Sequence, residues 1–270
     1  MDPTRRKWWT AGLWLAAVVL LALIAWRLTE AGRLPRAVGE PAQLEQKLDA
    51  FAAADPYMLA LKQYYPADYT ELRGAMLTDL REGHTLNEVQ ARAMERAREQ
   101  ADRRAAYVAA APVEDLTAVI AAERAVVRRL QADDQRLCAQ FGMSGLPTGA
   151  RTSSEAATLL SRAAEARVRA ARHGQEAPVE HAPPSAADLN ALRAAMLKSG
   201  AEADLVALIL SPNARQAPPH DQCAGSVAFY DALAALPPET AARWMSAITA
   251  QTAKSSAAQH PTGVKAQMEH

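Results

Sequence analysis

The feature that most constrains this chain is an uncharged apolar run near its amino terminus. Residues 8–26 (WWTAGLWLAAVVLLALIAW) hold no charged side chain over 19 positions. As an α-helix, this run extends about 28 Å, close to the roughly 30 Å hydrocarbon thickness of a bilayer. The run therefore predicts a single transmembrane helix. Tryptophans stand at both of its ends, where an indole ring prefers the headgroup boundary: Trp8, Trp9 and Trp26.

A cleaved signal peptide and a buried core helix are the two other interpretations of this run. A signal peptide has a shorter apolar stretch, followed by small residues at its cleavage site. Here the stretch is long and ends in Ala25-Trp26-Arg27, which offers no small-x-small site. A core helix rarely lacks charge for so many positions. An uncleaved signal-anchor at 8–26, after a basic tail at 1–7, is the favoured interpretation.

The orientation of the anchor follows from the basic residues around it. Three cluster tightly before it and three are spread over the segment after it. Basic residues favour the cytoplasmic side of a span. The tight cluster on the short side favours an inner-membrane protein whose C-terminal part lies outside the cytoplasm, which in a bacterium is the periplasm. The six residues are Arg5, Arg6, Lys7, Arg27, Arg33 and Arg36.

The charge of the remaining chain bears on its partners. The full chain is balanced, with 30 Lys+Arg and 30 Asp+Glu. The first 36 residues hold six basic and two acidic side chains, so the rest holds 24 basic and 28 acidic ones, a formal charge of −4. Such a body repels a polyanion, and nucleic acid is not an expected partner. The expected partners are the lipid bilayer, through residues 8–26, and another protein of the envelope.

Beyond the anchor, the sequence predicts helices only. Aromatic residues make up 5% of the chain, alanine dominates its apolar half, and no alternating strand pattern occurs. Capping boxes at Thr85–Glu88 and Thr152–Glu155, and a cap at Ser185, indicate three helix starts. The predicted fold class is all-α, with a transmembrane helix followed by an Ala-rich multi-helix bundle. A division into two sub-bundles is the finer expectation.

Breaks in the helical pattern predict the domain organisation. A juxtamembrane linker at 27–40 leads into a first helical subdomain at 41–174. Residues 175–184 (QEAPVEHAPP) form a linker before a second subdomain at 185–250. The polar tail at 251–270 is expected to be disordered. Leu44, Leu48 and Phe51 follow helical spacing until Asp55-Pro56 interrupts it. Further helices are predicted over 57–65, 66–83, 85–110, 112–137, 152–173, 185–198, 202–210, 223–236 and 238–250.

Cys138 and Cys223 are the only cysteines of the chain. Outside the cytoplasm, two thiols in a chain of this size most often form one disulfide, and this is our prediction. Closing the loop between them would remove roughly 4–5 kcal/mol of unfolded-state entropy on the chain-entropy model. The plainer alternative is a pair of small buried hydrophobic residues.

A catalytic or metal-binding role for Cys223 is the more specific alternative to a disulfide. His220 precedes it by three residues, with Asp221 between them. This set would suit a nucleophilic thiol with a histidine base, or a metal site with Cys138 as a further ligand. The sequence offers no fourth ligand and no oxyanion loop. No catalytic, cofactor-binding or metal-binding residue is therefore predicted, and no cofactor is expected.

A cluster of tyrosines is the candidate interface. It holds four of the six tyrosines of the chain within 13 residues. A tyrosine ring buries apolar area and keeps a polar edge, which suits both interfaces and cores, and core packing is the plainer interpretation. The four residues are Tyr57, Tyr64, Tyr65 and Tyr69.

These features predict a membrane-anchored helical interaction or scaffold protein of the bacterial cell envelope, with a chaperone-like or accessory role. In plan alone, such a protein is similar to the membrane-anchored steric chaperones of secreted lipases, although no motif of theirs occurs in this sequence. The alternative is an envelope hydrolase that uses Cys223 with His220, or a lone carboxylate such as Glu88. The capping-box position of Glu88 explains that residue without catalysis.

Overall fold

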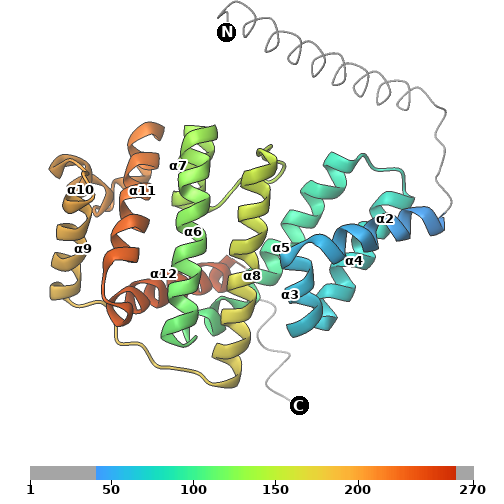
Figure 1. The fold of residues 1–270 in the computed structure, drawn as a ribbon, viewed down its shortest axis with the longest axis horizontal. Helices are drawn as coiled ribbons and strands as arrows, with labels where there is room; N and C mark the ends of the chain where they lie inside the picture. The colour runs from blue at the N-terminus through green and yellow to red at the C-terminus, as the bar shows by residue number, and fades with distance from the viewer. Residues whose placement is uncertain (1–40, 260–270) are drawn as a thin grey trace, which may run out of the picture. The chain divides into compact units, whose positions relative to one another are not determined.

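The computed structural model describes residues 41–259, which form helices joined by short turns and loops, with no strand among them (Figure 1). The all-α prediction is confirmed over this range. The chain divides into two compact units, residues 1–43 and 44–270. The predicted anchor at 8–26 and linker at 27–40 lie outside the described residues. Within 41–259, every helix is too short or too polar to cross a bilayer.

Eleven α-helices and one 3-10 turn make up the described part of the chain. They are α2 (Pro41–Ala54), α3 (Pro56–Tyr64), α4 (Pro66–Arg81), α5 (Leu86–Ala109), α6 (Val113–Asp133), α7 (Gln135–Ser144), α8 (Ser154–Glu176), α9 (Ala186–Lys198), α10 (Ala203–Ile209), the 3-10 turn (Ala214–Gln216), α11 (Pro219–Ala235) and α12 (Pro238–Gln259).

Side-chain hydrogen bonds cap the starts of five helices: α3, α5, α7, α8 and α9. The capping box at α5 is confirmed, because the Thr85 hydroxyl accepts from the Glu88 N–H and the Glu88 carboxylate accepts from the Thr85 N–H. Ser185 caps α9 as predicted, in a second capping box that Asp188 completes. At α8 the cap is Ser153, one residue after the predicted Thr152.

Three predicted boundaries are wrong, each for a local reason. The helix expected through Leu137 breaks at Asp134, whose carboxylate accepts two backbone N–H bonds and caps α7. Helix α11 begins at Pro219, four residues before the predicted start, because proline fits the first position of a helix. Helix α12 continues to Gln259, so residues 251–259, predicted to be disordered, are helical. Residues 260–270 lie outside the described range.

Within the second unit, the helices lie side by side in a row that runs from α9 through α11, α6 and α8 to α5 (Figure 1). Helix α7 packs on α11 and α6, and α3 packs on α8 and α4. Helix α12 packs across α5 and α6. Helices distant in sequence are therefore neighbours in this row.

One core cluster joins the two predicted subdomains. Leu116 and Ile120 of α6 are buried in the same cluster as Leu192 of α9, Leu233 of α11 and Met245 of α12. Helices from 41–174 and from 185–250 thus share one core, and the prediction of two sub-bundles is wrong. The irregular connection between them is residues 177–185, because α8 continues through Glu176 into the linker predicted at 175–184, and this connection is held in place. The Val179 N–H donates to the Ala110 carbonyl, and the His181 Nε2 lies 2.8 Å from the Ala111 carbonyl.

Buried carboxylates are paired across helices. An isolated buried charge is costly, so each pairing favours one register of the two helices that it joins. The Glu123 carboxylate of α6 pairs with Arg167 of α8 and accepts a 2.8 Å hydrogen bond from the Tyr230 hydroxyl of α11. The other pairs are Asp79 with Arg92 and Arg96, Asp115 with Arg169 and His173, and Asp188 with Arg243.

Candidate functional site

Cys138 of α7 and Cys223 of α11 form a disulfide, which confirms the predicted pairing. The bridge spans 85 residues of sequence and joins Cα atoms 5.2 Å apart. Both residues are at most 1% exposed, within an apolar cluster that includes Val126 and Leu130 of α6. The disulfide therefore fastens α7 to α11 from inside the core.

This disulfide removes the chemistry considered for Cys223. Its sulfur is bonded to Cys138, and the described chain holds no free cysteine that could act as a nucleophile or a metal ligand. His220 lies in the first turn of α11 with 68% of its side chain exposed. Its Nε2 lies 2.9 Å from a carboxylate oxygen of the adjacent Asp221. The two residues form a surface pair.

Glu88, the candidate lone carboxylate, is held in the capping box. Hydrogen bonds from the Thr85 backbone N–H and hydroxyl keep the pKa of Glu88 below its usual value. A general acid at neutral pH needs the opposite shift. Glu88 is thus suited to capping a helix.

One group of metal-ligand side chains occurs in the described part of the chain. Asp79, Glu82 and His84 place possible ligand atoms within 4.8 Å of one another, where α4 ends. Burial raises the pKa of Asp79, but hydrogen bonds from Arg96 and Arg92 outweigh it, and the pKa lies below its usual value. Each Asp79 oxygen already accepts from a guanidinium. Asp79, Glu82 and His84 therefore belong to an ion-pair network at the end of α4.

The tyrosine cluster is divided between the core and a pocket. The Tyr64 ring meets the His173 ring edge-on, with centroids 6.4 Å apart. The Arg104 guanidinium lies 4.9 Å from the centroid of the Tyr65 ring. Tyr69 alone among the four lines the pocket described next, so it is the member best placed for an interface. All four border the core cluster formed mainly by α2, α3 and α4: Tyr57, Tyr64, Tyr65 and Tyr69.

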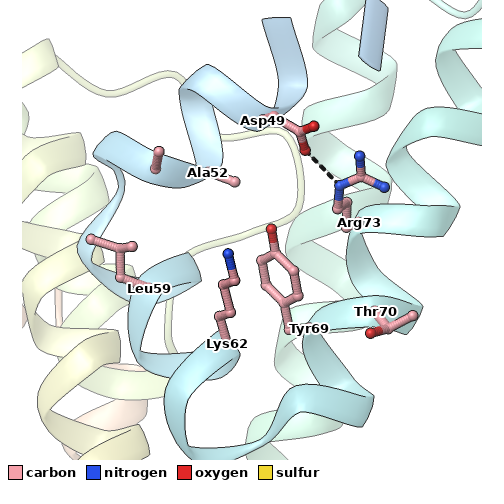
Figure 2. Close-up of a pocket in the computed structure, with 8 residues that line it drawn as sticks. Asp49, Ala52, Leu59, Lys62, Tyr69, Thr70 and Arg73 are labelled. Carbon is pink, nitrogen blue, oxygen red and sulfur yellow. Dashed lines mark hydrogen bonds and ion pairs between the residues drawn. The ribbon is translucent and has the colours of Figure 1, made fainter. Parts of the chain in front are cut away.

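A pocket of about 540 Å³ lies between α2, α3 and α4 (Figure 2). Small and aliphatic side chains supply its apolar surface, and charged side chains stand beside them. Figure 2 shows the Lys62 and Tyr69 side chains next to each other, both extending toward the Asp49–Arg73 pair. The lining residues are Asp49, Ala52, Ala53, Leu59, Lys62, Tyr69, Thr70 and Arg73.

Arg73 and Lys62, the two cationic side chains that line the pocket, differ in their ion pairs. The Arg73 Nε donates to Asp49 at 2.7 Å, and its second guanidinium nitrogen donates to Glu45 at 2.8 Å. This hydrogen bond from Arg73 keeps the pKa of Asp49 below its usual value. Lys62 forms no ion pair with any described residue, and its ammonium lies 5.8 Å from the centroid of the Tyr69 ring. The positive charge of Lys62 also lowers the pKa of Asp49, so Lys62 already acts on a carboxylate of the same pocket.

Two large apolar side chains are exposed on α2 and α3, and one of them lines this pocket. Leu59, which lines it, is 47% exposed, and Phe51, directly before the lining residue Ala52, is 51% exposed. Sequence reasoning missed this surface, because the pocket exists only where α2 lies against α4. The available signal was Glu45 and Asp49, two carboxylates one helical turn apart that can bind one arginine.

Comparisons with known proteins return nothing for this chain: no protein-family model, no curated protein and no solved structure matches it.

Proposed function

We propose that this chain is a single-pass, membrane-anchored helical scaffold of the cell envelope, whose second unit makes protein contacts outside the cytoplasm. The observation that carries the proposal is the buried Cys138–Cys223 disulfide. Disulfides persist in oxidising compartments and are rare where cytosolic reductants keep thiols reduced. The uncharged run at 8–26 supplies a way to hold the chain at a membrane that borders such a compartment.

A binding role fits the pocket better than a catalytic one. Thr70 Oγ1 donates to the carbonyl of Pro66 at 2.8 Å, and Asp49 is bound by Arg73, so neither activates a nucleophile. Apolar area bordered by charged groups is the usual composition of a protein-binding surface. The hydrolase alternative is less well supported, because the Cys223 sulfur is already bonded.

The proposal is tested on the full chain in cells. Alkaline phosphatase, which is active only where disulfides form, is fused after His270, and a thiol label is applied after denaturation without reductant. We expect an active phosphatase, no labelled cysteine, and a chain that stays with the membranes through an alkaline wash. A phosphatase that is inactive although the fusion is intact, or labelling of both cysteines, would place the chain in the cytoplasm and overturn the proposal.

A further inference from the structure

The disulfide between α7 and α11 lies where no reagent can reach its sulfur atoms. Cys138 is fully buried and Cys223 is 1% exposed, in an apolar cluster with Val126 of α6 and Ala163 of α8. Thiol–disulfide exchange requires one sulfur to approach another, so its rate depends on access. The bridge therefore forms while one of these helices is out of place. We propose that this helix is α7, and that Cys138 is the thiol that first reacts with a disulfide donor.

Helix α7 contributes least to the core among the helices around the bridge. It lies close to α11, but it buries only Cys138 and Ala139 completely, whereas α6, α8 and α11 each bury six or more residues. In the described part of the chain, no side-chain hydrogen bond and no ion pair joins α7 to another helix. Helix α11, by contrast, also places Leu233 in the largest core cluster. Helix α7 can therefore leave while α11 stays.

The rest of the core does not depend on α7. The largest core cluster takes its buried side chains from α5, α6, α8, α9, α10, α11 and α12 and from Ala111, and none from 135–144. The chain also breaks on both sides of α7. The helix is separated from α6 at Asp134, and Gly145, in the left-handed region at φ +83°, begins the non-helical connection 145–153. A segment bounded in this way can open locally while the other helices stay packed.

The local opening of α7 gives the two cysteines different roles. Cys138 moves outward with α7, while Cys223 stays on α11. The Cys138 thiolate attacks the disulfide of the donor, a mixed disulfide forms, and one donor sulfur leaves as a thiol. When α7 returns, the Cys223 thiolate attacks the Cys138 sulfur and releases the second donor thiol. The chain loses two electrons and two protons, which the donor gains.

The test compares two single-thiol forms of the full chain in mild detergent. Cys223→Ser leaves only Cys138 and Cys138→Ser leaves only Cys223, so each is the matched control of the other. The probe is oxidised glutathione, and the mixed disulfide is measured by mass spectrometry. We expect Cys138 to react about tenfold faster than Cys223 or more, because only Cys138 moves into solvent with α7. In urea, after unfolding, the two rates should be similar.

Two further substitutions in the Cys223→Ser chain distinguish local opening from global unfolding. Gly142→Ala adds a Cβ that clashes with Ser226 of α11, so it should weaken the docking of α7 and speed the reaction of Cys138 about tenfold. Leu72→Ala removes a buried side chain of α4, which packs on α3 and α5. It should lower the melting temperature and leave the rate unchanged. Urea below the unfolding transition should also leave the rate nearly unchanged, because local opening exposes little surface.

Two results would overturn the role of α7. One is an equal rate at Cys138 and Cys223 in the folded chains. The other is a rate at Cys138 that rises steeply with urea from the outset or equally with Leu72→Ala and Gly142→Ala, since the whole fold would then have to open. A Cys223→Ser chain that is already unfolded in detergent counts as the second result.

The donor is identified in cells with the same two chains. Thiols are blocked with N-ethylmaleimide before lysis, and the adduct on each chain is weighed. An adduct of protein mass on Cys138 indicates an oxidising enzyme, and a small adduct indicates a low-molecular-weight disulfide. More adduct on Cys223 than on Cys138 would contradict the order of reaction. The rates of the purified chains do not depend on the compartment, so this inference and the proposed function fail separately.

Discussion

Gly142 of α7 packs directly against Ser226 of α11, so closely that a Cβ atom at position 142 would lie 2.5 Å from the Ser226 Cβ. The contact lies one turn beyond the disulfide on both helices, since Cys138 precedes Gly142 by four residues and Cys223 precedes Ser226 by three. Glycine is unfavourable inside a helix. Its presence in α7 is explained by this close approach.

Gly142→Ala is expected to destabilise the protein by about 1–3 kcal/mol, because the added methyl group overpacks the contact between α7 and α11. The free energy of unfolding is measured by urea denaturation of the full chain in mild detergent, followed by circular dichroism. Ser226→Gly in the same chain removes the clashing Cβ and should restore most of the loss.

Gly74→Ala is the matched control for this substitution. Gly74 lies inside α4, and a Cβ atom there meets no atom within 4 Å. The substitution should therefore stabilise the protein by about 0.5–1 kcal/mol through helix propensity alone. If both alanine variants were stabilised, α7 would not pack on α11 as closely as the structure has it.

Cys138→Ser and Cys223→Ser are each expected to lower stability to a similar extent, because either change breaks the same bond. The chain-entropy model puts the loss for a loop of this length at roughly 4–5 kcal/mol. The double variant should be no less stable than the single ones, as measured by thermal unfolding without reductant. Strictly additive losses would contradict a bond between the two residues.

Sequence reasoning succeeded where the determining interaction is local or chemically restricted. Thr85 and Glu88 lie within one helical turn, so the sequence alone predicts their capping box. The disulfide was predictable for a different reason, because the chain offers only one possible pairing. The break at Asp134 was missed because the apolar stripe continues from α6 into α7 and gives no sign of an interruption.

Features that depend on contacts between segments distant in sequence could not be predicted in the same way. The Pro-rich connection at 175–184 predicted a boundary between subdomains, yet Leu116 and Leu192 on either side of it share one core. The composition of a linker does not determine whether the helices that flank it pack together. The pocket likewise requires Arg73 to bind Glu45 and Asp49, a tertiary contact that periodicity alone does not reveal.

Arg167→Met is expected to destabilise the protein by roughly 1.5–3 kcal/mol, because it removes a charge-assisted hydrogen bond from the buried Glu123 carboxylate. Arg162→Met on the same helix is the matched control. Arg162 is exposed and forms no ion pair with a described residue, so its replacement should change stability by less than about 0.5 kcal/mol. Equal effects of the two substitutions in urea denaturation would show that Glu123 does not depend on its partner.

Acid is expected to unfold the protein mainly below pH 4. Hydrogen bonds from Arg243 and Ser185 hold the pKa of Asp188 far below its usual value, and hydrogen bonds from Arg129 and Ser153 lower the pKa of Asp133 to about 2. A carboxyl group whose folded pKa is depressed contributes stability above its unfolded pKa, near 4, and loses that contribution as the pH falls through its folded pKa. The melting temperature should therefore fall between pH 4 and pH 2.

The variant Arg243→Met tests the cause of this acid sensitivity. Without the guanidinium, the folded pKa of Asp188 moves toward its unfolded value, so the variant should be less stable at pH 7 and lose less stability between pH 4 and pH 2. The measurement is the melting temperature of both chains across that range. Parallel curves for the two chains would mean that Asp188 contributes nothing to the acid transition.

Truncation after Gln251 is expected to leave the melting temperature nearly unchanged. Thr249, which is 2% exposed, is the last buried side chain that the structure describes, and Lys254 is exposed. Residues 252–254 include no buried side chain, and changes at surface positions alter stability by about 0.5 kcal/mol or less. Far-ultraviolet circular dichroism should nevertheless register the loss of roughly two helical turns, because α12 continues to Gln259.

Truncation before Met245 is the contrasting case. It removes the buried Met245 side chain and the Ser246 hydroxyl, which donates to the Ala109 carbonyl at 2.6 Å and docks α12 on α5. Removing a large buried side chain alone costs about 2–5 kcal/mol, so this shorter chain should melt many degrees lower or not fold. A similar large drop after truncation at Gln251 would mean that the last turns of α12 are docked as well. The position of the drop along α12 thus marks where its contact with the core ends.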